Sequence, residues 1–453
     1  MSDRRASLRN DDGESGAPSL TRPTLLAYGL PGLPLAVLSL PLFVYLPAFY
    51  AEDVGVGFAA VGVALLVARI WDVVTDPLIG GLSDRFTTPW GRRRPWLVLG
   101  TPLVALSAWF LFHPPAEAGW LYLLAWTMLL YLGGTMIMLP YQAWGAELSD
   151  DYDARSRISA YREAFVVIGI LVATGIPALL GAGKGEALTI LAWLLLASLP
   201  LAVALACGLV PDRARRSPKR RDWRRAMKVL RENRPFRRLI AAYFINGIAN
   251  GLPASLFLLF VENVLGAPSW AGPLLFVYFL CGILAVPLWL RLSYRYGKHR
   301  VWALAMVATC FVFVWVPFLG PGDHWLFAII CVLTGLGLGA DLVLPPAMQA
   351  DVIDLDTVKS RRRRAGLYFA LWGVATKLAL ALAVGIAFPL LDLAGLEPDK
   401  DTSTGLFALA ALYSLVPAIL KLGSVALVAG YPITAPRQRR IRRLIEARDL
   451  TPS

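Results

Sequence analysis

The stretch R-I-W-D-V-V-T-D-P-L-I-G-G-L-S-D-R-F-T-T-P-W-G-R-R-R-P-W, residues 69 to 96, carries the residues around which the rest of the chain is organised. Its first part continues an apolar run that starts near Val56 and is long enough to cross a bilayer. Asp72 and Asp76 lie four residues apart inside this run, so they share one face of a helix. A carboxylate at membrane depth is costly, and such acids usually face a cavity, a partner or a bound cation. The alternative is a structural salt bridge of both acids with Arg69.

The composition predicts a polytopic α-helical membrane protein. The 453 residues are 57% hydrophobic and include many apolar runs long enough to span a membrane. The net charge of +13 lies in short blocks between these runs, which argues against a nucleic-acid partner. The four cysteines fall in apolar runs without CxxC spacing, so we interpret them as packing residues rather than as a disulfide framework or a metal site.

Hydropathy predicts twelve crossings, with a consistent charge pattern between them. They are expected at about 25 to 50, 56 to 82, 96 to 114, 119 to 147, 159 to 182, 187 to 210, 238 to 261, 270 to 293, 300 to 320, 324 to 349, 366 to 393 and 404 to 430. Lys and Arg collect in every second connection, whereas the intervening connections are mainly acidic. This alternation predicts a multi-pass protein of the inner (plasma) membrane with both termini in the cytoplasm.

The chain also repeats itself at half its length. Leu82-Ser-Asp-Arg-Phe and the following Gly91-Arg-Arg-Arg-Pro-Trp96 have a weaker echo from Leu292 to Trp302. We therefore expect two parallel six-helix halves with a binding site between them. The expected parts are a disordered cytoplasmic N-terminus at 1–24, an N-terminal bundle at 25–210, a basic linker at 211–237, a C-terminal bundle at 238–430 and a basic cytoplasmic tail at 431–453.

One set of motifs is specific enough to suggest a family. Its members in and after the second crossing are Arg69, Trp71-Asp72, Asp76-Pro77, Gly80, Asp84-Arg85, Trp90-Gly91 and Arg94-Pro95, with further matches at Pro140-Tyr141, Glu147-Leu148 and Ala350 to Asp354. Over about residues 24 to 435, the chain resembles the glycoside-pentoside-hexuronide cation symporters, the melibiose-permease-like branch of the major facilitators. The resemblance implies an all-α fold of twelve transmembrane helices in two six-helix pseudo-repeats. One departure is Thr75, where melibiose-type relatives commonly carry Asn.

The resemblance implies a coupling-cation site formed by the paired acids and by oxygen-bearing side chains near them. The matching positions are Asp72, Thr75, Asp76 and Thr135. Carboxylates and hydroxyls form a hard-oxygen site suited to Na⁺ or Li⁺, and a protonated carboxyl would carry H⁺ in the same place. No cofactor and no metal other than this coupling ion are expected.

The resemblance is weaker on the substrate side. Two sugar-binding acids of melibiose-type relatives align near Ala36 and Met138, so both acids are missing. The remaining candidate substrate residues are Tyr141, Gln142, Trp144, Arg162, Asp341 and Lys377. Arg162 and Lys377 match basic family positions and would suit an acidic solute such as a hexuronide. Alternatively, Lys377 pairs with Asp341 or with an acid of the second crossing and binds no solute.

The general major-facilitator loop motif implies a gating role for the charges after the second crossing. These residues are Asp84, Arg85, Arg92, Arg93 and Arg94. By resemblance they form a cytoplasmic charge lock that stabilises the outward-facing state, and the alternative is that they only set the topology.

Three classes of function remain. Cation-coupled symport of a sugar or glycoside-like solute by alternating access is favoured, with the solute, the cation and the lipid bilayer as partners and a monomer as the working state. A cation-coupled carrier of lysolipids or other amphiphiles is the nearest alternative, because relatives of this fold carry lysophospholipids and the loss of the sugar-binding acids leaves an apolar cavity. A membrane receptor or enzyme is the distant alternative, because the sequence has no catalytic Ser/His/Asp or metal-ligand constellation.

Overall fold

The structure is a computed structural model that describes residues 21–149, 152–212, 231–360, 365–396 and 403–433, together with positions 438 and 440. Within these residues it is helical, and twelve spans are long and apolar enough to cross a membrane. The spans are Arg22–Asp53, Phe58–Arg85, Arg94–Phe112, Trp120–Glu147, Arg157–Leu180, Lys184–Leu209, Arg234–Val264, Pro268–Tyr296, Lys298–Phe318, His324–Val358, Leu367–Leu393 and Ser403–Ala429. The prediction of twelve crossings is therefore confirmed, and most of their ends agree within a few residues.

Three predicted segments lie largely outside the described residues. They are the N-terminus at 1–24, the linker at 211–237 and the tail at 431–453. Two helices begin a few residues before the predicted starts of their crossings. Helix α1 (Arg22–Gly29) begins before residue 25, and α10 (Arg234–Leu259) begins before residue 238.

Most crossings are formed by one long α-helix. These helices are α4 (Phe58–Arg85), α5 (Arg94–Phe112), α6 (Trp120–Glu147), α7 (Tyr152–Leu180), α8 (Lys184–Leu209), α11 (Ala271–Tyr296), α12 (Lys298–Phe313), α13 (His324–Ser360) and α14 (Ala365–Leu393). Short 3₁₀ turns adjoin α11 and α12 at η4 (Pro268–Trp270) and η5 (Val316–Phe318).

The remaining crossings are built from several pieces. The first comprises α1, α2 (Gly32–Leu40), η1 (Pro41–Tyr45), α3 (Leu46–Ala48) and η2 (Phe49–Asp53). The seventh is α10 with η3 (Phe260–Val264), and the twelfth is α15 (Ser403–Ala410), η6 (Ala411–Leu415) and α16 (Val416–Ala429). Proline has no backbone N–H to donate, so Pro31, Pro41 and Pro47 explain why the first crossing departs from one regular helix.

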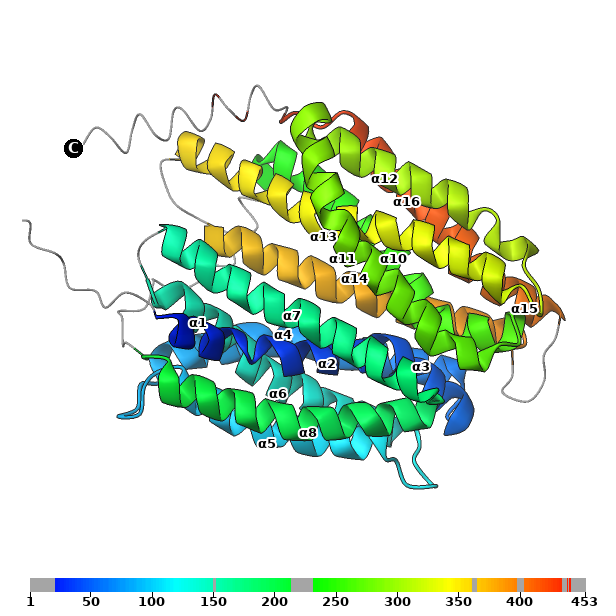
Figure 1. Cartoon of the computed structure of the whole chain (residues 1–453), viewed down its shortest axis with the longest axis horizontal. Coiled ribbons are helices and arrows are strands. Elements are labelled where there is room, and N and C mark those ends of the chain that lie inside the picture. The colour runs from blue at the N-terminus through cyan, green and yellow to red at the C-terminus, as the bar shows by residue number, and fades with distance from the viewer. Residues whose placement is uncertain are drawn as a thin grey trace, which may run out of the picture.

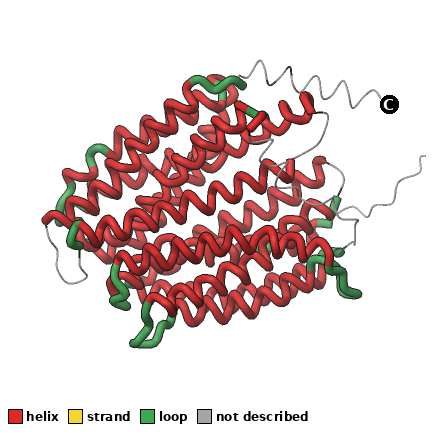
Figure 2. The backbone as a smooth tube through the Cα atoms, turned by 180° about the vertical axis from the view of Figure 1, so that it is seen from behind, coloured by secondary structure: helices red, strands yellow, loops and turns green. Residues whose placement is uncertain are grey.

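The helices run lengthwise, and the loops among the described residues lie at the two ends of the bundle (Figure 2). Helices α1 to α8, the N-terminal helices, occupy one side of the molecule, and α10 to α16, the C-terminal helices, occupy the other (Figure 1). Because the number of crossings is even, Thr21 and Ile433 lie at the same end. We call this the basic end, because it carries Arg92 to Arg94, and the other the acidic end, because it carries Glu52 and Glu262.

The two sets of helices approach each other closely near the acidic end. Gly62 of α4 is so close to α14 that an added Cβ would lie 2.8 Å from Pro389, and a Cβ at Gly385 of α14 would lie 2.9 Å from Leu66. At Gly272 of α11, a Cβ would lie 2.9 Å from the backbone of Ala178 in α7. Small residues permit such contacts between transmembrane helices, so substitution here would push the two sets apart.

Candidate functional site

The paired acids lie on one face of α4, as their spacing predicts. Asp72 is buried, with 3% of its side chain exposed, and Asp76 is 19% exposed. The Thr135 hydroxyl of α6 lies 3.0 Å from Asp72 Oδ1 and 2.9 Å from Asp76 Oδ1. The Thr75 hydroxyl instead donates to the backbone oxygen of Asp72 at 3.1 Å. The structure therefore brings three of the four predicted cation-site side chains into direct contact and turns Thr75 back onto its own helix.

Lys377 of α14 occupies the space between the two acids. Its ammonium nitrogen lies 2.8 and 2.7 Å from the two carboxylate oxygens of Asp76 and 2.9 Å from Asp72 Oδ2. The three N–H groups of a lysine ammonium are matched by three oxygens. Of the two partners that the sequence leaves open for Lys377, the structure selects the acids of the second crossing rather than Asp341.

Arg69 completes the charge balance of this cluster. Its guanidinium lies 2.9 Å from Asp72 Oδ2 and 4.0 Å from the ring centre of Tyr131, a cation–π arrangement. The salt bridge that the sequence suggests for both acids is thus formed with Asp72, whereas Asp76 pairs with Lys377. We call Asp72, Asp76, Thr135, Arg69 and Lys377 the acid-pair site, in which two negative and two positive charges compensate each other.

The predicted substrate residues of α6 and α7 take part in other contacts. Tyr141 is buried and donates to the backbone oxygen of Tyr28 at 2.6 Å, and the buried Trp144 donates to that of Pro211 at 3.0 Å. Gln142 is exposed. Arg162 lies 2.6 Å from Glu163, so its charge is already compensated.

The sixth candidate, Asp341 of α13, belongs to a separate buried cluster that the sequence analysis missed. Its carboxylate accepts hydrogen bonds from Asn246 and Asn250 of α10 and from Trp302 of α12, and it lies 3.4 Å from Lys421 of α16. Lys421 is the single charged residue between positions 404 and 430. An ionisable side chain alone in a transmembrane run marks a functional or structural site, so this signal was present in the sequence.

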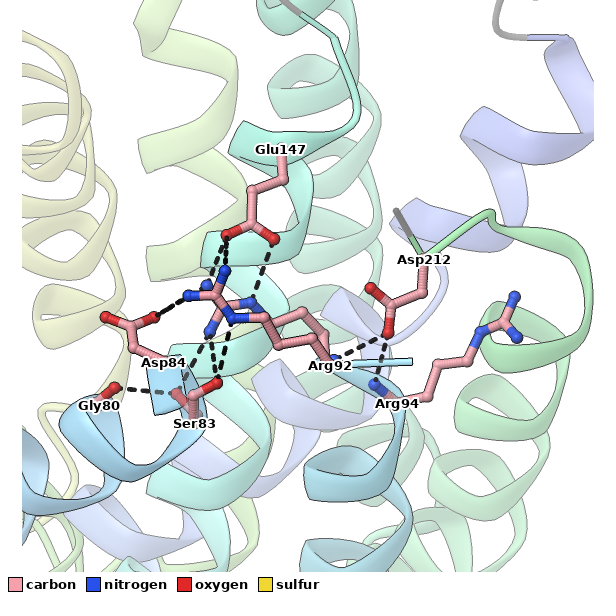
Figure 3. A network of polar contacts seen from close by, with 8 residues as sticks. Gly80, Ser83, Asp84, Arg92, Arg94, Glu147 and Asp212 are labelled. Atoms are coloured by element: carbon pink, nitrogen blue, oxygen red, sulfur yellow. Dashed lines mark hydrogen bonds and ion pairs between the residues drawn. The ribbon is translucent and has the colours of Figure 1, made fainter. Parts of the chain in front are cut away.

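The loop charges form a network that joins the start of α5 to α4 and α6 (Figure 3). Arg93 binds Glu147 of α6 at 2.5 Å and Asp84 of α4 at 2.9 Å, and Arg92 binds Asp84 at 3.0 Å. Burial acts to lower the pKa of the Arg93 guanidinium, but the hydrogen bonds and charges of Glu147 and Asp84 outweigh it and raise the pKa, so Arg93 stays charged. Arg85 is exposed. The sequence did not assign Glu147 to this group, although its family motif pointed to it.

Asp212 ties the end of the N-terminal helices to the same network (Figure 3). Its carboxylate accepts from the backbone N–H groups of Arg93 at 2.8 Å and Arg94 at 3.3 Å, at the start of α5, where the helix dipole favours a negative charge. The Arg94 side chain donates to the backbone oxygen of Val210 at 2.8 Å.

The C-terminal helices repeat the main link of this network. Lys298, the first residue of α12 and part of the echo of residues 82 to 96, lies 2.7 Å from Asp351 of α13. Arg93 and Glu147 make the corresponding link among the N-terminal helices. In each set, a basic residue at or just before the start of the third crossing thus pairs with an acid toward the end of the fourth crossing.

At the acidic end, a second lysine joins the two sets of helices. Lys184 of α8 lies 2.5 Å from Glu52, 3.1 Å from Asp53 and 2.6 Å from Glu262, and Asn263 donates to Glu52 at 2.7 Å. Glu262 and Asn263 belong to η3, so these contacts cross from the N-terminal to the C-terminal helices. We call these residues the acidic-end cluster.

The twelve-helix fold defines a class of protein, a transporter of the major facilitator superfamily, and the comparison with known families agrees. A family model described as MFS/sugar transport protein matches residues 27–435. The chain belongs to this family. The resemblance to the glycoside-pentoside-hexuronide cation symporters is thereby confirmed.

Curated relatives cover nearly the whole chain. An uncharacterized symporter of Synechocystis, sll1374, is 25% identical over 94% of this chain and 96% of its own length. The human sodium-dependent lysophosphatidylcholine symporter 1 is 26% identical over 93% of this chain and 88% of its own. The putative glycoside/cation symporter YagG of Escherichia coli is 25% identical over 95% of this chain and 96% of its own.

Solved transporter structures share the fold. The nucleoside transporter NupG, crystallised as a D323A mutant, aligns with a TM-score of 0.69 over 89% of this chain and 99% of its own, at 12% identity. A structure from work on proton-dependent oligopeptide transporters aligns with a TM-score of 0.67 at 10% identity. At these identities the likeness concerns the fold alone.

Proposed function

We propose that the acid-pair site is where a coupling cation, Na⁺, Li⁺ or H⁺, binds during symport. The observation that carries this proposal is the position of the Lys377 ammonium, which is held by three carboxylate oxygens of Asp72 and Asp76. A small cation has the same requirement for oxygen ligands, and the Thr135 hydroxyl oxygen adds a further one. Lys377 then acts as an internal competitor that holds the site while no cation is bound.

Exchange of Lys377 for a cation would couple binding to a change of conformation. Lys377 lies on α14 and the acids lie on α4, so their ion pairs tie the two sets of helices together. A cation that displaces the ammonium breaks this tie and leaves Lys377 free to contact the solute or water. A ligand shifts a conformational equilibrium only through different affinities for the two states, and this competition supplies the difference.

The acidic-end cluster would close the second gate of an alternating-access cycle. Its contacts and the glycine contacts at Gly62 and Gly272 hold the two sets of helices together at that end. The described contacts of Arg93 with Asp84 and Glu147 lie within the N-terminal helices, and we expect this network to gain partners from the C-terminal helices when the basic end closes. We place the basic end in the cytoplasm of the cell, because positive charge collects there.

Replacement of Glu262 by Gln should favour opening at the acidic end. The change removes one carboxylate from the half-buried cation Lys184, which costs about 1–2 kcal/mol, so the ratio of closed to open molecules should fall roughly 5- to 30-fold. Spin labels on cysteines at Gly119 and Gly320, two open loop positions at this end, would report the distance by electron paramagnetic resonance. The matched control is Glu186→Gln, which removes an exposed acid from α8. Distances identical to those of the wild type would rule out a gating role for this contact.

For the solute, we propose a sugar or glycoside. This assignment follows the family and the relationship to a putative glycoside/cation symporter. An acidic solute is less well supported by the geometry, because Arg162 pairs with Glu163 and Lys377 with the acids of α4. The Asp341 carboxylate is likewise occupied by four donors.

A lysolipid is the second candidate. The human relative named for lysophosphatidylcholine covers 93% of the chain, against 95% for the glycoside relative. In addition, Met138, which aligns with a sugar-binding acid of the family, is 46% exposed. An apolar surface at that position fits an acyl chain better than a sugar hydroxyl.

The thermal stability of the purified protein tests both candidates in one experiment. A ligand that binds the folded state raises the apparent melting temperature by mass action. We expect Na⁺ or Li⁺ to raise it and a neutral glycoside, added with the cation, to raise it further. Uronides and lysophosphatidylcholine complete the panel. A further rise with the lysolipid and none with the sugars would replace the first candidate by the second, and no response to cation or pH would contradict coupling itself.

A further inference from the structure

The buried cluster around Lys421 has the features of a filled cation site. Only 3% of the Lys421 side chain and 12% of the Asp341 side chain are exposed. The ammonium nitrogen lies 2.9 Å from Asn246 Oδ1, 2.7 Å from Asn250 Oδ1 and 3.4 Å from Asp341 Oδ2. We call these three oxygens the Lys421 cage. They come from α10 and α13, whereas Lys421 reaches them from α16.

The hydrogen-bonding capacity of the cage is fully used. A lysine ammonium has three N–H groups and no acceptor, and three oxygens surround it here. The Asp341 carboxylate has about four acceptor sites, and it receives Asn246 at 3.0 Å, Trp302 at 2.6 Å, Asn250 at 2.9 Å and the lysine itself. The amide groups thus orient their oxygens toward the cation and their N–H groups toward the carboxylate. Such an arrangement stabilises one positive charge at one position.

The chemistry of the cage suits ions other than lysine. Two amide oxygens and one carboxylate form a set of hard oxygen ligands, which binds small hard cations. The single negative charge of the carboxylate balances a monovalent cation. The acid-pair site uses the same principle, since three oxygens surround the Lys377 ammonium there. The difference is burial, because 24% of the Lys377 side chain is exposed and only 3% of the Lys421 side chain.

We propose that the Lys421 cage is a second monovalent-cation site, in the C-terminal helices, which the chain fills permanently with its own ammonium group. Lys421 replaces an exchangeable ion, so the charge balance of α10, α13 and α16 does not depend on the cation gradient. Coupling to the gradient is then confined to the acid-pair site. If the ammonium is removed while the oxygens remain, the cage takes up Na⁺, K⁺ or NH₄⁺ from solution.

The variant Lys421→Met tests this inference, because Met fills the space of the lysine stem and leaves the position of the ammonium open. It should be made together with Asp76→Asn, so that the acid-pair site does not contribute to the response. The melting temperature is measured in NaCl, KCl and NH₄Cl, and in N-methyl-D-glucamine chloride at the same ionic strength. We expect the melting temperature of the double variant to rise in proportion to the logarithm of the concentration of a small cation. Asp76→Asn alone should show no such rise. Equal melting temperatures in the small and the bulky cation would overturn the proposal.

Two further measurements keep the result unambiguous. Adding Asp341→Asn to Lys421→Met should abolish the response to small cations, because the carboxylate that balances their charge is gone. If Lys421→Met is too unstable to purify, membranes that contain the variant are extracted with detergent in NaCl or in N-methyl-D-glucamine chloride. Gel filtration then compares the monodisperse fraction of the protein between the two salts. A larger fraction in NaCl supports the proposal, and equal loss in both salts contradicts it. None of these readouts involves transport, so a failure here is distinguishable from a failure of the symport proposal.

Discussion

Replacement of Asp76 by Asn is expected to abolish cation-driven uptake and to leave the protein folded. The substitution keeps the shape of the side chain and an oxygen for Thr135, but it removes one of two negative charges that a cation would need. Loss of one partner of a buried charge pair costs roughly 3 kcal/mol, which corresponds to about a 100-fold loss of cation affinity. Asp72→Asn should act in the same way, with an added loss of stability because Arg69 then lacks its partner.

The measurement combines uptake in vesicles with thermal stability of the purified variants. Imposed Na⁺ and H⁺ gradients should each be tried, since the geometry accommodates either ion. Glu117→Gln is the matched control, because it removes a negative charge from an exposed turn outside the site. The control should retain uptake and the stabilisation by cation, and both should be lost in Asp76→Asn. Gradient-driven uptake at the wild-type rate in both Asp72→Asn and Asp76→Asn would refute the assignment.

Much of the fold and part of the site can be predicted from the sequence, for local reasons. Length and hydropathy of each apolar run determine the crossings, and the spacing of Asp72 and Asp76 places both on one face of α4. Thr135 follows from the family motif, and its hydroxyl lies within 3.0 Å of both acids. Thr75 matches the motif equally well, yet its hydroxyl bonds its own helix, since a Ser or Thr inside a helix readily donates to a backbone oxygen of the preceding turn.

The sequence left the partner of Lys377 open between Asp341 and the acids of the second crossing, because the choice depends on tertiary packing. Lys377 is 301 residues from Asp76 in the sequence, and the register of α14 against α4 decides which acid it meets. For Asp341, the sequence offered a substrate role, but the carboxylate is fully engaged by α10, α12 and α16. Asn246 and Asn250 carry no charge, so nothing in the sequence distinguished them from other polar residues in apolar helices.

Three lysines, Lys184, Lys377 and Lys421, each form contacts between elements that are distant in the sequence. Lys184 joins the two sets of helices at the acidic end, Lys377 joins them at the acid-pair site, and Lys421 stays within the C-terminal helices. An ion pair inside a membrane has little water to compete with it, so it holds its helices firmly until another charge replaces one partner. Of the three, only Lys377 contacts residues that a coupling cation would use, and it is therefore the one whose removal should separate binding from transport.

Replacement of Lys377 by Met should tighten cation binding and at the same time abolish coupled uptake. If the lysine occupies the site in about nine of ten molecules without cation, its removal lowers the apparent dissociation constant roughly tenfold, because the competent fraction rises. Without any cation, the variant should be less stable than the wild type by about 3 kcal/mol, since two carboxylates then share only Arg69 as a positive partner. Transport should fail because cation binding no longer breaks a tie between α4 and α14.

The test is a cation titration of the melting temperature in three proteins. The wild type and Lys377→Met give the two affinities, and Lys377→Met with Asp76→Asn is the matched control in which the charges are again balanced one to one. This double variant should regain stability without cation and lose the tight cation response. A weaker cation response in Lys377→Met than in the wild type would contradict the role of competitor and would instead make the ammonium a required part of the cation or solute site. Both outcomes can be read without knowing the solute, because the competition takes place among Lys377, the two carboxylates of α4 and the ion.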